Sequence, residues 1–386
     1  MIKELTIENT KLPEGWCSEK LDILCDVEYG TRVVRKKDGG TIYPVYGGGG
    51  ATFFMDTFNR EDCLVVARFA MSEKCTRFVN GKFFLNDSGL SVNPKDTDIV
   101  SQEFLNKYFI FLNDYIYSLA RGTAQKNLNV PAFRKIEILY PESLTKQKQI
   151  VAILDKAFAA IDNAKANAQQ NLENVKELFE SYLQNVFSTK GNDWEEVALG
   201  KLCELTRGHN PPKSKFIDEP KENYVRFYQI RDGWSDKYMV YVPDTTKLHK
   251  VVPTDMLMVA YRHIGRVFRG VTGAFNVALC KISNTSRDRL DDDFLFYMIP
   301  TDIIKGELMK RSERSLIPSM SVNHLKEIVI PLPPITEQEE IVQKLDSLSE
   351  ETKKIEAIYI QKIADLEEMK KSVLQKAFSG QLNTIN

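Results

Sequence analysis

The sequence contains no apolar run of about 18 residues, the length that a membrane-spanning helix requires. Its opening stretch, MIKELTIENT, lacks the apolar core of a secretory signal peptide. We therefore expect a soluble, cytoplasmic protein without a membrane partner. With 386 residues, of which 43% are hydrophobic and 27% charged, the chain has room for two or three domain cores.

Cysteine is scarce, and its spacing is uninformative for metal binding. The chain has six cysteines, and no two of them form a C-x-x-C pair. The missing pair favours reduced, mostly buried thiols over the alternative of a zinc site. We expect no bound metal.

An excess of either charge is also missing. Lysine and arginine number 52 and aspartate and glutamate 53, which gives a formal net charge of −1. The charge of the whole chain therefore gives no argument for a nucleic-acid partner, and any basic surface must be local.

The sequence does contain an internal duplication. The string TKQKQIVAILD, which begins at Thr145, returns as TEQEEIVQKLD at Thr336, and LQNVFS at 183–188 returns as LQKAFS at 374–379. The upstream ends also correspond, residue by residue: Trp16, Leu21, Leu24, Cys25 and Gly30 with Trp194, Leu199, Leu202, Cys203 and Gly208. Between these ends, only a D-x-L-x-V-A echo at 62–67 and 255–260 is shared. Two copies at a period far above that of solenoids predict a pseudo-symmetric protein.

The shared C-terminal ends of the two halves have the periodicity of long helices. Apolar residues recur mostly at steps of three and four from Thr145 to about Ser188, and again from Thr336 onward. Each run follows a proline-bearing stop, and its first threonine is placed to N-cap the helix. About 40 residues at 1.5 Å each span roughly 60 Å, too long for a helix of a compact domain. We expect the two helices to form an antiparallel coiled coil that acts as a spacer; a helix of an ordinary bundle is the alternative.

The middles of the two halves differ from each other and read as mixed α+β globules of about 130 residues. Short apolar runs at 63–69, 135–141, 256–262 and 327–333 predict strands, and 104–122 and 294–309 predict helices. We therefore expect an α+β protein with recognition domains at 1–144 and 190–335 and long helices at 145–189 and 336–386. Because loops on rigid scaffolds carry function, divergent middles on shared frames suggest two recognition heads with different specificities.

Basic residues recur at corresponding places in the two middles. The stretches GTRVVRKK and RGHNPPKSK surround the shared Gly30 and Gly208, and this recurrence favours phosphate contacts over a merely solvated face. Arginine can read guanine, and glutamine or asparagine can read adenine, through paired hydrogen bonds. The candidate DNA contacts of the first half are Arg32, Arg35, Lys36, Lys37, Gly48, Gly49, Arg68, Gln125, Lys126, Asn127 and Asn129. Those of the second half are Arg207, His209, Lys213, Gln229, Arg231, Arg262, Arg266 and Arg269.

Three short stretches imitate enzyme motifs. NPPK at 210–213 has lysine where amino-methyltransferases carry an aromatic residue, and no glycine motif for S-adenosylmethionine accompanies it. GGGG at 47–50 lacks the G-K-[ST] of a phosphate loop and reads as a flexible or close-approach loop. EPK at 219–221 has a proline that spoils the strand a nuclease site requires. We therefore expect no catalytic residues and no cofactor.

The paired helix starts, together with RGTAQKNLN at 121–129 and VYGGGGA at 45–51, resemble the specificity subunit of type I restriction-modification systems. The resemblance covers almost the whole chain, although the second middle departs further from the family pattern. It implies a non-catalytic DNA-binding subunit that reads a two-part asymmetric sequence in double-stranded DNA. The implied partners are two modification (methyltransferase) subunits and the ATP-dependent restriction subunits, in a complex that methylates adenine and cleaves DNA. A self-sufficient methyltransferase or nuclease with two recognition heads is the alternative.

Three further expectations concern assembly. The halves should be related by a pseudo-two-fold axis, with the helices holding the heads apart. Each head should read its own half-site. Apolar residues off the main helix seam should mark the docking surface of the modification subunits, and the alternative is that they are buried in a satellite cluster within the chain. These residues are Phe158, Phe179, Phe187, Ile358 and Phe378.

Overall fold

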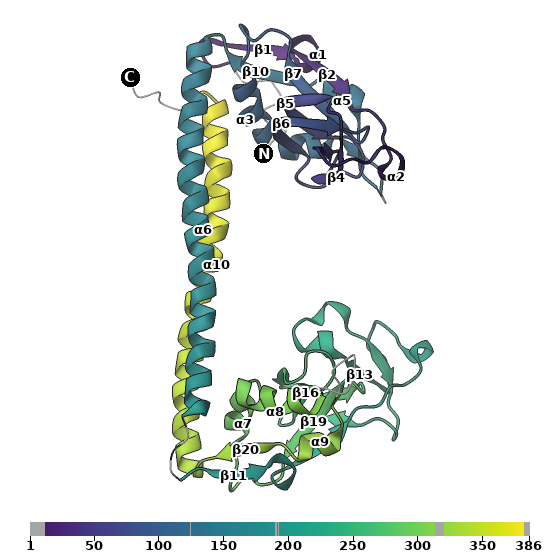
Figure 1. Ribbon diagram of the computed structural model, residues 1–386, viewed down its shortest axis with the longest axis vertical. Helices are drawn as coiled ribbons and strands as arrows, with labels where there is room; N and C mark the ends of the chain where they lie inside the picture. Colours follow the sequence, from purple (N-terminus) through teal and green to yellow (C-terminus); the bar gives the residue numbers. More distant parts are fainter. Residues whose placement is uncertain (1–11, 124, 190, 192, 313–319, 382–386) are drawn as a thin grey trace. The chain divides into compact units, whose positions relative to one another are not determined.

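The computed structural model describes residues 12–123, 125–189, 191, 193–312 and 320–381. The chain divides into two compact units, Met1–Gln169 with Gln361–Asn386, and Gln170–Ile360. Each unit contains one α+β globule, which we call the first head (β1 to β10) and the second head (β11 to β20), together with parts of two long helices (Figure 1).

The first head is built around one six-stranded sheet. Its strand order is β2-β7-β5-β6-β3-β4, and a separate pair joins β1 to β10. The central strand β5 ends in the run Cys63–Ala67, which is buried throughout, because both faces of the sheet are covered there. The elements are β1 (Trp16–Lys20), α1 (Leu21–Leu24), β2 (Cys25–Tyr29), α2 (Arg35–Asp38), β3 (Tyr43–Tyr46), β4 (Ala51–Met55), β5 (Arg60–Ala67), β6 (Thr76–Leu85), β7 (Gly89–Pro94), α3 (Gln102–Phe111), α4 (Asn113–Ser118), β8 (Ala120–Arg121), β9 (Asn127–Leu128), α5 (Val130–Arg134) and β10 (Glu137–Pro141).

The second head repeats this plan with two four-stranded sheets, β12-β19-β16-β17 and β14-β13-β18-β15, and with a β11-β20 pair. Its strands are β11 (Glu195–Ala198), β12 (Cys203–Arg207), β13 (Tyr224–Tyr228), β14 (Tyr241–Pro243), β15 (Lys250–Val251), β16 (Met256–Val259), β17 (Val267–Arg269), β18 (Gly273–Phe275), β19 (Leu279–Asn284) and β20 (Val329–Leu332). Its helices are α7 (Asp292–Met298), α8 (Asp302–Ser312) and α9 (Val322–Lys326), with short 3₁₀ helices η2 (Leu199–Lys201), η3 (Lys213–Lys215), η4 (Ile230–Gly233) and η5 (Asp236–Tyr238).

Strand register shows how the two heads correspond. In the first head Leu64 pairs with Val92, and in the second Met256 pairs with Ile282, so β5 and β7 correspond to β16 and β19. The D-x-L-x-V-A echo had aligned Leu64 with Leu257, which is one residue out of this register. A one-residue slip moves a side chain to the other face of a sheet, and Leu257 does lie in a different core cluster from Met256. The strand and helix types predicted for the two middles are otherwise confirmed.

The two long helices are α6 (Leu144–Ser188) and α10 (Ile335–Phe378). Both begin one residue before the threonine that we expected to be the N-cap, so that prediction was wrong. Instead, both helices carry a fully buried glutamine in the first turn, and its side chain forms hydrogen bonds to the head. The Gln147 amide donates to the carbonyls of Ile99 and Pro141 at 2.8 and 2.9 Å and accepts from the amide of Ser101 at 2.9 Å. Gln338 makes the corresponding bonds to Arg289, Pro333 and Asp291 at 2.7, 2.8 and 2.8 Å.

The T-x-Q string therefore occurs twice in the sequence because the glutamine of each copy, Gln147 or Gln338, joins the start of its helix to the preceding head. Since an unpaired buried polar group is costly, any replacement would leave two carbonyls and one amide without a partner.

The two helices pack against each other. In the first unit Lys370 pairs with Asp162 at 2.9 Å and Lys165 pairs with Glu367, so residue numbers fall along α10 as they rise along α6. The helices are therefore antiparallel in this unit, as predicted.

The ends of the long helices complete the cores of the heads. In the first unit the Phe378 ring packs against Phe104, Tyr108 and Phe111, with centroid distances of 5.5, 5.0 and 5.3 Å. In the second unit Phe187 lies 5.2 Å from Phe294. The end of α6, the helix that follows the first head, thus lies in the core of the second head, and the end of α10 lies in the core of the first.

This arrangement corrects our expectation for three of the five aromatic and aliphatic residues off the helix seam. Phe158, Phe187 and Phe378 are buried in the head cores, and Phe179 is half-buried. Only Ile358 of that set is well exposed, at 63%. Apolar residues off a helix–helix seam need not be left over, because a third element can cover them.

All six cysteines are free thiols, and every one except Cys17 is buried. Burial raises the pKa of Cys25 and of Cys203 to about 12, so these thiols stay protonated at neutral pH. The expected burial of most of the thiols is confirmed.

Candidate nucleic-acid interface

In both heads, several strand connections gather at one end of the central sheet. In the first head β2 and β5 end there and β7 begins, with Tyr29 paired with Leu90 and Ala67 with Gly89. In the second head the same end has Arg207 paired with Cys280 and Val259 with Leu279. We call this the loop end of each head. It comprises residues 29–31, 47–50, 68–74, 86–88, 121–123 and 125–127 in the first head, and 207–210, 229–238, 260–266 and 276–278 in the second.

The glycines shared by the two halves build the frame of the loop end. Gly30 donates its amide to the carbonyl of Gly89 at 3.1 Å, and Gly208 donates to Leu279 at 3.2 Å. A Cβ on Gly30 would collide with the carbonyl oxygen of Asn86, and a Cβ on Gly208 with that of Asn276. These two glycines are therefore required for close backbone approach.

The glycine loop at 47–50 lies in this frame. The amide of Gly48 donates to Ser88 Oγ at 3.1 Å, and the Arg77 guanidinium donates to the carbonyls of Gly48 and Gly49. A Cβ on Gly48 would lie 2.6 Å from the Phe69 carbonyl oxygen, whereas one on Gly49 would meet nothing within 4 Å. The tip of the loop thus presents bare backbone to its surroundings, and Arg77, a residue that no sequence motif indicated, fixes the loop through its hydrogen bonds.

Arg68 follows β5 at the loop end. Its guanidinium carbon lies 5.0 Å from the centre of the Tyr29 ring and 4.0 Å from that of Phe69. The Tyr29 ring is 49% exposed. Cation–π contacts with these two rings position the guanidinium without neutralising its charge.

The stretch RGTAQKNLN forms a narrow hairpin of β8 and β9. Asn127 accepts a hydrogen bond from the amide of Ala70 at 3.3 Å, and the Asn129 amide, with its oxygen towards Arg121, accepts from that guanidinium at 2.8 and 3.3 Å. These two predicted base readers therefore bond to the protein itself. Gln125 and Lys126 are exposed near the tip, and Lys126 lies 4.4 Å from the Tyr117 ring.

The basic run after Gly30 forms the single turn α2 and its approach. Arg32, Arg35, Lys36 and Lys37 are all exposed. None of them forms an ion pair with any residue that the structure describes. Uncompensated exposed cations of this kind suit contact with phosphates.

In the second head, the basic residues around the shared Gly208 have two different environments. Arg207 is half-buried, and its guanidinium donates to the carbonyls of Val277 and Met320. Burial lowers the pKa of Arg207 from its ordinary value, yet the group stays charged. His209 and Lys213 are exposed. Arg207 thus braces the loops, whereas His209 and Lys213 remain accessible.

Gln229 and Arg231 lie in the long connection between β13 and β14. Gln229 begins the 3₁₀ helix η4 through a reciprocal capping box with Asp232. The Arg231 guanidinium carbon lies 5.1 Å from the Tyr238 ring. Trp234 and Tyr238, both 51% exposed, lie in the same connection and were missed from the sequence. A tryptophan in the polar stretch DGWSDK, with Arg231 directly before it and Lys237 at its end, was the signal that could have found them.

Arg262 and Arg266 lie in the turn after β16. Arg262 is exposed and has a positive φ of 63°, and the corresponding residue after β5, Ala70, has a φ of 47°. Residues other than glycine seldom adopt this backbone conformation, and those that do are concentrated at functional sites. Arg266 is exposed, with its guanidinium 4.9 Å from the Trp234 ring.

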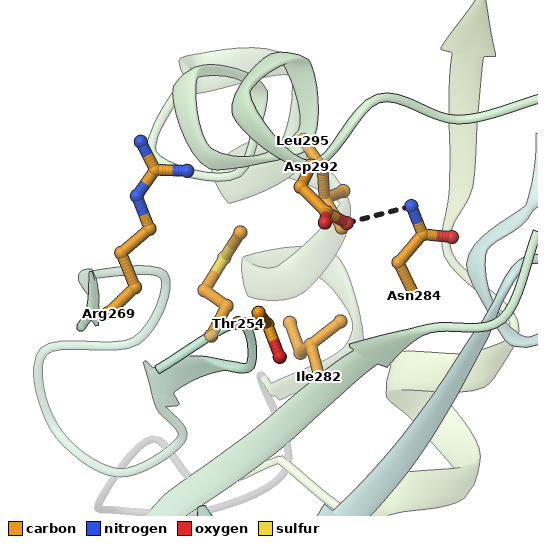
Figure 2. Close-up of a pocket in the computed structure, with 7 residues that line it drawn as sticks. Thr254, Arg269, Ile282, Asn284, Asp292 and Leu295 are labelled. Carbon is orange, nitrogen blue, oxygen red and sulfur yellow. Dashed lines mark hydrogen bonds between the residues drawn. The ribbon is translucent and has the colours of Figure 1, made fainter. Parts of the chain in front are cut away.

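Arg269 lies at the opposite end of the sheet, since its partner in β16 is Met256. It forms an ion pair with Asp293 and stacks 4.4 Å from the Phe296 ring. Figure 2 shows Arg269 beside a small pocket whose other side carries the hydrogen bond from Asn284 to Asp292, at 2.8 Å. Arg269 is therefore separated from the other candidates of its head.

The three enzyme look-alikes lie in loops. Asn210 of NPPK accepts from the amide of Val277 at 3.2 Å, and residues 219–221 of EPK form no strand. Across the described ranges, no group of three or more histidine, cysteine, aspartate or glutamate residues is placed to hold a metal. No helix in the same part of the chain is both long and apolar enough to cross a membrane.

The fold and these loop ends define a two-headed recognition protein with a duplicated frame. The model of the type I restriction modification DNA specificity domain matches the chain twice, at residues 13–174 and 191–365, and the chain belongs to this family.

Two relatives from Escherichia coli are specificity subunits of type I restriction enzymes. The chain is 23% identical to the EcoDI subunit, over 78% of this chain and 76% of that one, and 24% identical to the EcoBI subunit, over 73% and 67%. Among solved structures, a chain described under complex assembly and conformational transition of the type I R-M system superposes with a TM-score of 0.75. The superposition covers 97% of this chain and 100% of the solved chain, and the two sequences are 19% identical. This likeness concerns the fold alone.

Proposed function

We propose that this chain is the sequence-specific DNA-binding subunit of a type I restriction-modification complex, and that each head reads one half of a bipartite, asymmetric target in double-stranded DNA. The observation that carries the proposal is that two loop ends share one backbone frame, around Gly30 and Gly208, and present different side chains on it. A shared frame docks on the same DNA shape, and different side chains read different bases.

The contacts divide by type. The exposed cations near Gly30 and Gly208, such as Lys36, Lys37 and Lys213, suit phosphates and would set the salt dependence of binding. Gln125, Lys126 and Arg262 have accessible ends and suit base edges. Asn127, Asn129, Arg207 and Gln229 hold the loops through bonds within the protein and would act on recognition indirectly.

The long helices would set the spacer between the half-sites and dock the modification subunits. Large apolar side chains remain exposed on both helices within the second unit, namely Leu178 and Tyr182 on α6 and Ile355 and Ile358 on α10. Exposed apolar residues on otherwise charged helices suit a protein interface. The double variant Leu178→Lys, Ile358→Lys should assemble less with the modification subunits, as measured by size-exclusion chromatography. Its melting temperature should be unchanged.

Catalysis would belong to the partner subunits, because no hydrogen bond among the described residues of the loop ends joins a nucleophile to a base. The purified chain alone should transfer no labelled methyl group from S-adenosylmethionine to DNA, and transfer should begin when the modification subunits are added. Methyl transfer by the chain alone would favour the alternative, a self-sufficient enzyme. A separate DNA cleavage assay, with the restriction subunits and ATP added, tests cleavage by the full complex.

A further inference from the structure

The connection between β3 and β4 in the first head corresponds to the connection between β13 and β14 in the second. Strand β3 pairs in parallel with β6, Tyr46 lying opposite Leu85, and β13 pairs in parallel with β18, Tyr228 lying opposite Phe275. The next residue of each partner strand, Asn86 or Asn276, donates its amide to the carbonyl of that tyrosine at 2.8 or 3.0 Å. The two connections therefore leave the same point of the same frame.

The two connections differ in kind. In the first head the tyrosine is followed by four glycines, 47–50, and then by β4. In the second head, residues 229–240 take their place and carry Trp234, at the C-cap of η4, and Tyr238, in η5, both 51% exposed. At one place in the frame, a glycine loop in the first head thus corresponds to a loop with two half-exposed aromatic rings in the second.

The position of Trp234 is fixed by its neighbours. Its ring lies 5.8 Å from that of Phe268, and a Cβ on the preceding Gly233 would lie 2.6 Å from the Phe268 ring. Asp232, which is 6% exposed, caps the turn by accepting a hydrogen bond from the backbone N–H of Gln229 at 2.7 Å. One part of the tryptophan is therefore supported, while about half of its surface is open.

The charges around the ring favour a nucleic acid as its occupant. Arg266 lies 4.9 Å from the Trp234 ring, and Arg231 and Lys237 lie 5.1 and 5.4 Å from the Tyr238 ring. The acidic residues of the loop are already committed, Asp236 to an ion pair with Arg226 and Asp232 to its cap. Aromatic rings bordered by free cations suit stacked bases beside phosphates.

We propose that Trp234 is a stacking wedge for duplex DNA: its ring packs on a base of the second half-site and partly unstacks one base step, while Arg266 faces the adjacent phosphate. This inference rests on the proposed function and deepens it. Apolar side chains used in this way kink the duplex, so the second head would read deformability as well as base edges. The glycine loop of the first head has no ring at the equivalent place, and the first half-site should stay stacked.

The test uses the full chain and a duplex that carries the methylation motif found by methylome sequencing, with a scrambled duplex for comparison. The chain has three tryptophans, of which Trp16 is buried, Trp194 is half-buried and Trp234 is exposed. Motif DNA should quench the tryptophan fluorescence of the wild type and of Trp194→Phe, and should quench Trp234→Phe much less although that variant still binds. Trp234→Leu should weaken binding roughly tenfold with an unchanged melting temperature.

A second measurement places the wedge on the DNA. 2-Aminopurine is substituted at each position of the motif in turn. Its fluorescence should increase at one step of the second half-site when the wild type binds, and should not increase when Trp234→Leu binds. If Trp234→Leu binds the motif as tightly as the wild type and the quench persists in Trp234→Phe, the wedge is wrong while the proposed function stands. If the wild type binds motif and scrambled duplexes equally, the proposed function fails. If Trp234→Leu weakens assembly with modification subunits in the absence of DNA, the ring belongs to a protein interface and the wedge is overturned.

Discussion

Gly30 and Gly208 are the residues on which the shared frame depends most directly. Replacement of either one by alanine would drive a Cβ into a backbone carbonyl that is itself hydrogen-bonded in place. We expect Gly30→Ala and Gly208→Ala each to lower the free energy of unfolding by about 1–3 kcal/mol, the usual cost of an overpacked site. Urea denaturation measures this loss, and hydrogen exchange should place it in the first head for Gly30→Ala and in the second for Gly208→Ala.

Gly306 supplies the control for these two variants. It lies in helix α8, and a Cβ there would meet nothing within 4 Å. Gly306→Ala should therefore stabilise the protein by about 0.5–1 kcal/mol through helix propensity. Equal effects of all three substitutions would contradict the collision that we infer at the loop ends.

The positive φ of Arg262 gives a prediction in which stability and function change in opposite directions. Arg262→Gly should stabilise the fold by about 1 kcal/mol, because glycine adopts the left-handed conformation without strain. It should also weaken binding of the motif duplex, because the accessible guanidinium is lost. Asn223→Gly is the matched control, since Asn223 has a φ of 62° in the same head and lies away from the loop end. If Arg262→Gly left both affinity and sequence preference unchanged, Arg262 would not contact DNA.

At the residue scale, the sequence could locate the polar loops but could not assign the role of each side chain. Asn127 and Gln125 are two positions apart, yet one bonds to the Ala70 amide and the other is open to solvent. Arg207 and Arg266 look alike in the sequence, yet Arg207 is fixed by two carbonyls contributed by distant segments. Such roles depend on neighbours brought in by the tertiary fold, which leave no trace in local spacing.

Among the elements, the ends of the long helices link the two halves of the chain. Phe378→Ala removes a ring that contacts three aromatic side chains of the first head, and should cost about 3–5 kcal/mol. Hydrogen exchange should show the loss in α3 and in the strands beneath it. Met369→Ala on the same helix is the control, because Met369 is 52% exposed and its replacement should change stability by less than about 0.5 kcal/mol. Intact protection of α3 in Phe378→Ala would contradict the core assigned here.

The elements themselves were largely predictable, because their signals are local. Three- and four-residue periodicity predicted the starts of both long helices to within one residue, although α10 ends at Phe378, before the predicted end at residue 386. Apolar runs predicted β5, β10, β16 and β20. Two features needed the structure. The glutamine that ties each helix start to its head bonds to residues about 50 positions away, and the alignment of β5 with β16 depends on pairing with β7 and β19.

For the whole molecule, duplication and divergence have separate physical roles. The repeated parts are those with one structural solution: the buried glutamines, the frame glycines and the aromatic residues at the helix ends. The divergent parts are the loop ends, where a glycine loop in the first head corresponds to an aromatic loop in the second. A duplicated chain can in this way keep its architecture while each half presents its own loop side chains.

If the helices set the spacer, a matched change in both should alter spacing alone. In the first unit the pairs Asp162–Lys370 and Lys165–Glu367 fix the level at which the helices meet, so residues 163–169 of α6 lie opposite residues 363–369 of α10. Deleting both heptads preserves the seam and shortens the pair by roughly 10 Å, about 3 base pairs of DNA rise. Methylome sequencing of a host that carries the variant should return the same two half-sites with a shorter spacer. Deletion of one heptad alone should instead disrupt the pairing and reduce methylation at every site. A paired deletion that left the spacer unchanged, or that altered the half-sites themselves, would show that the distance between the half-sites is not set by these helices.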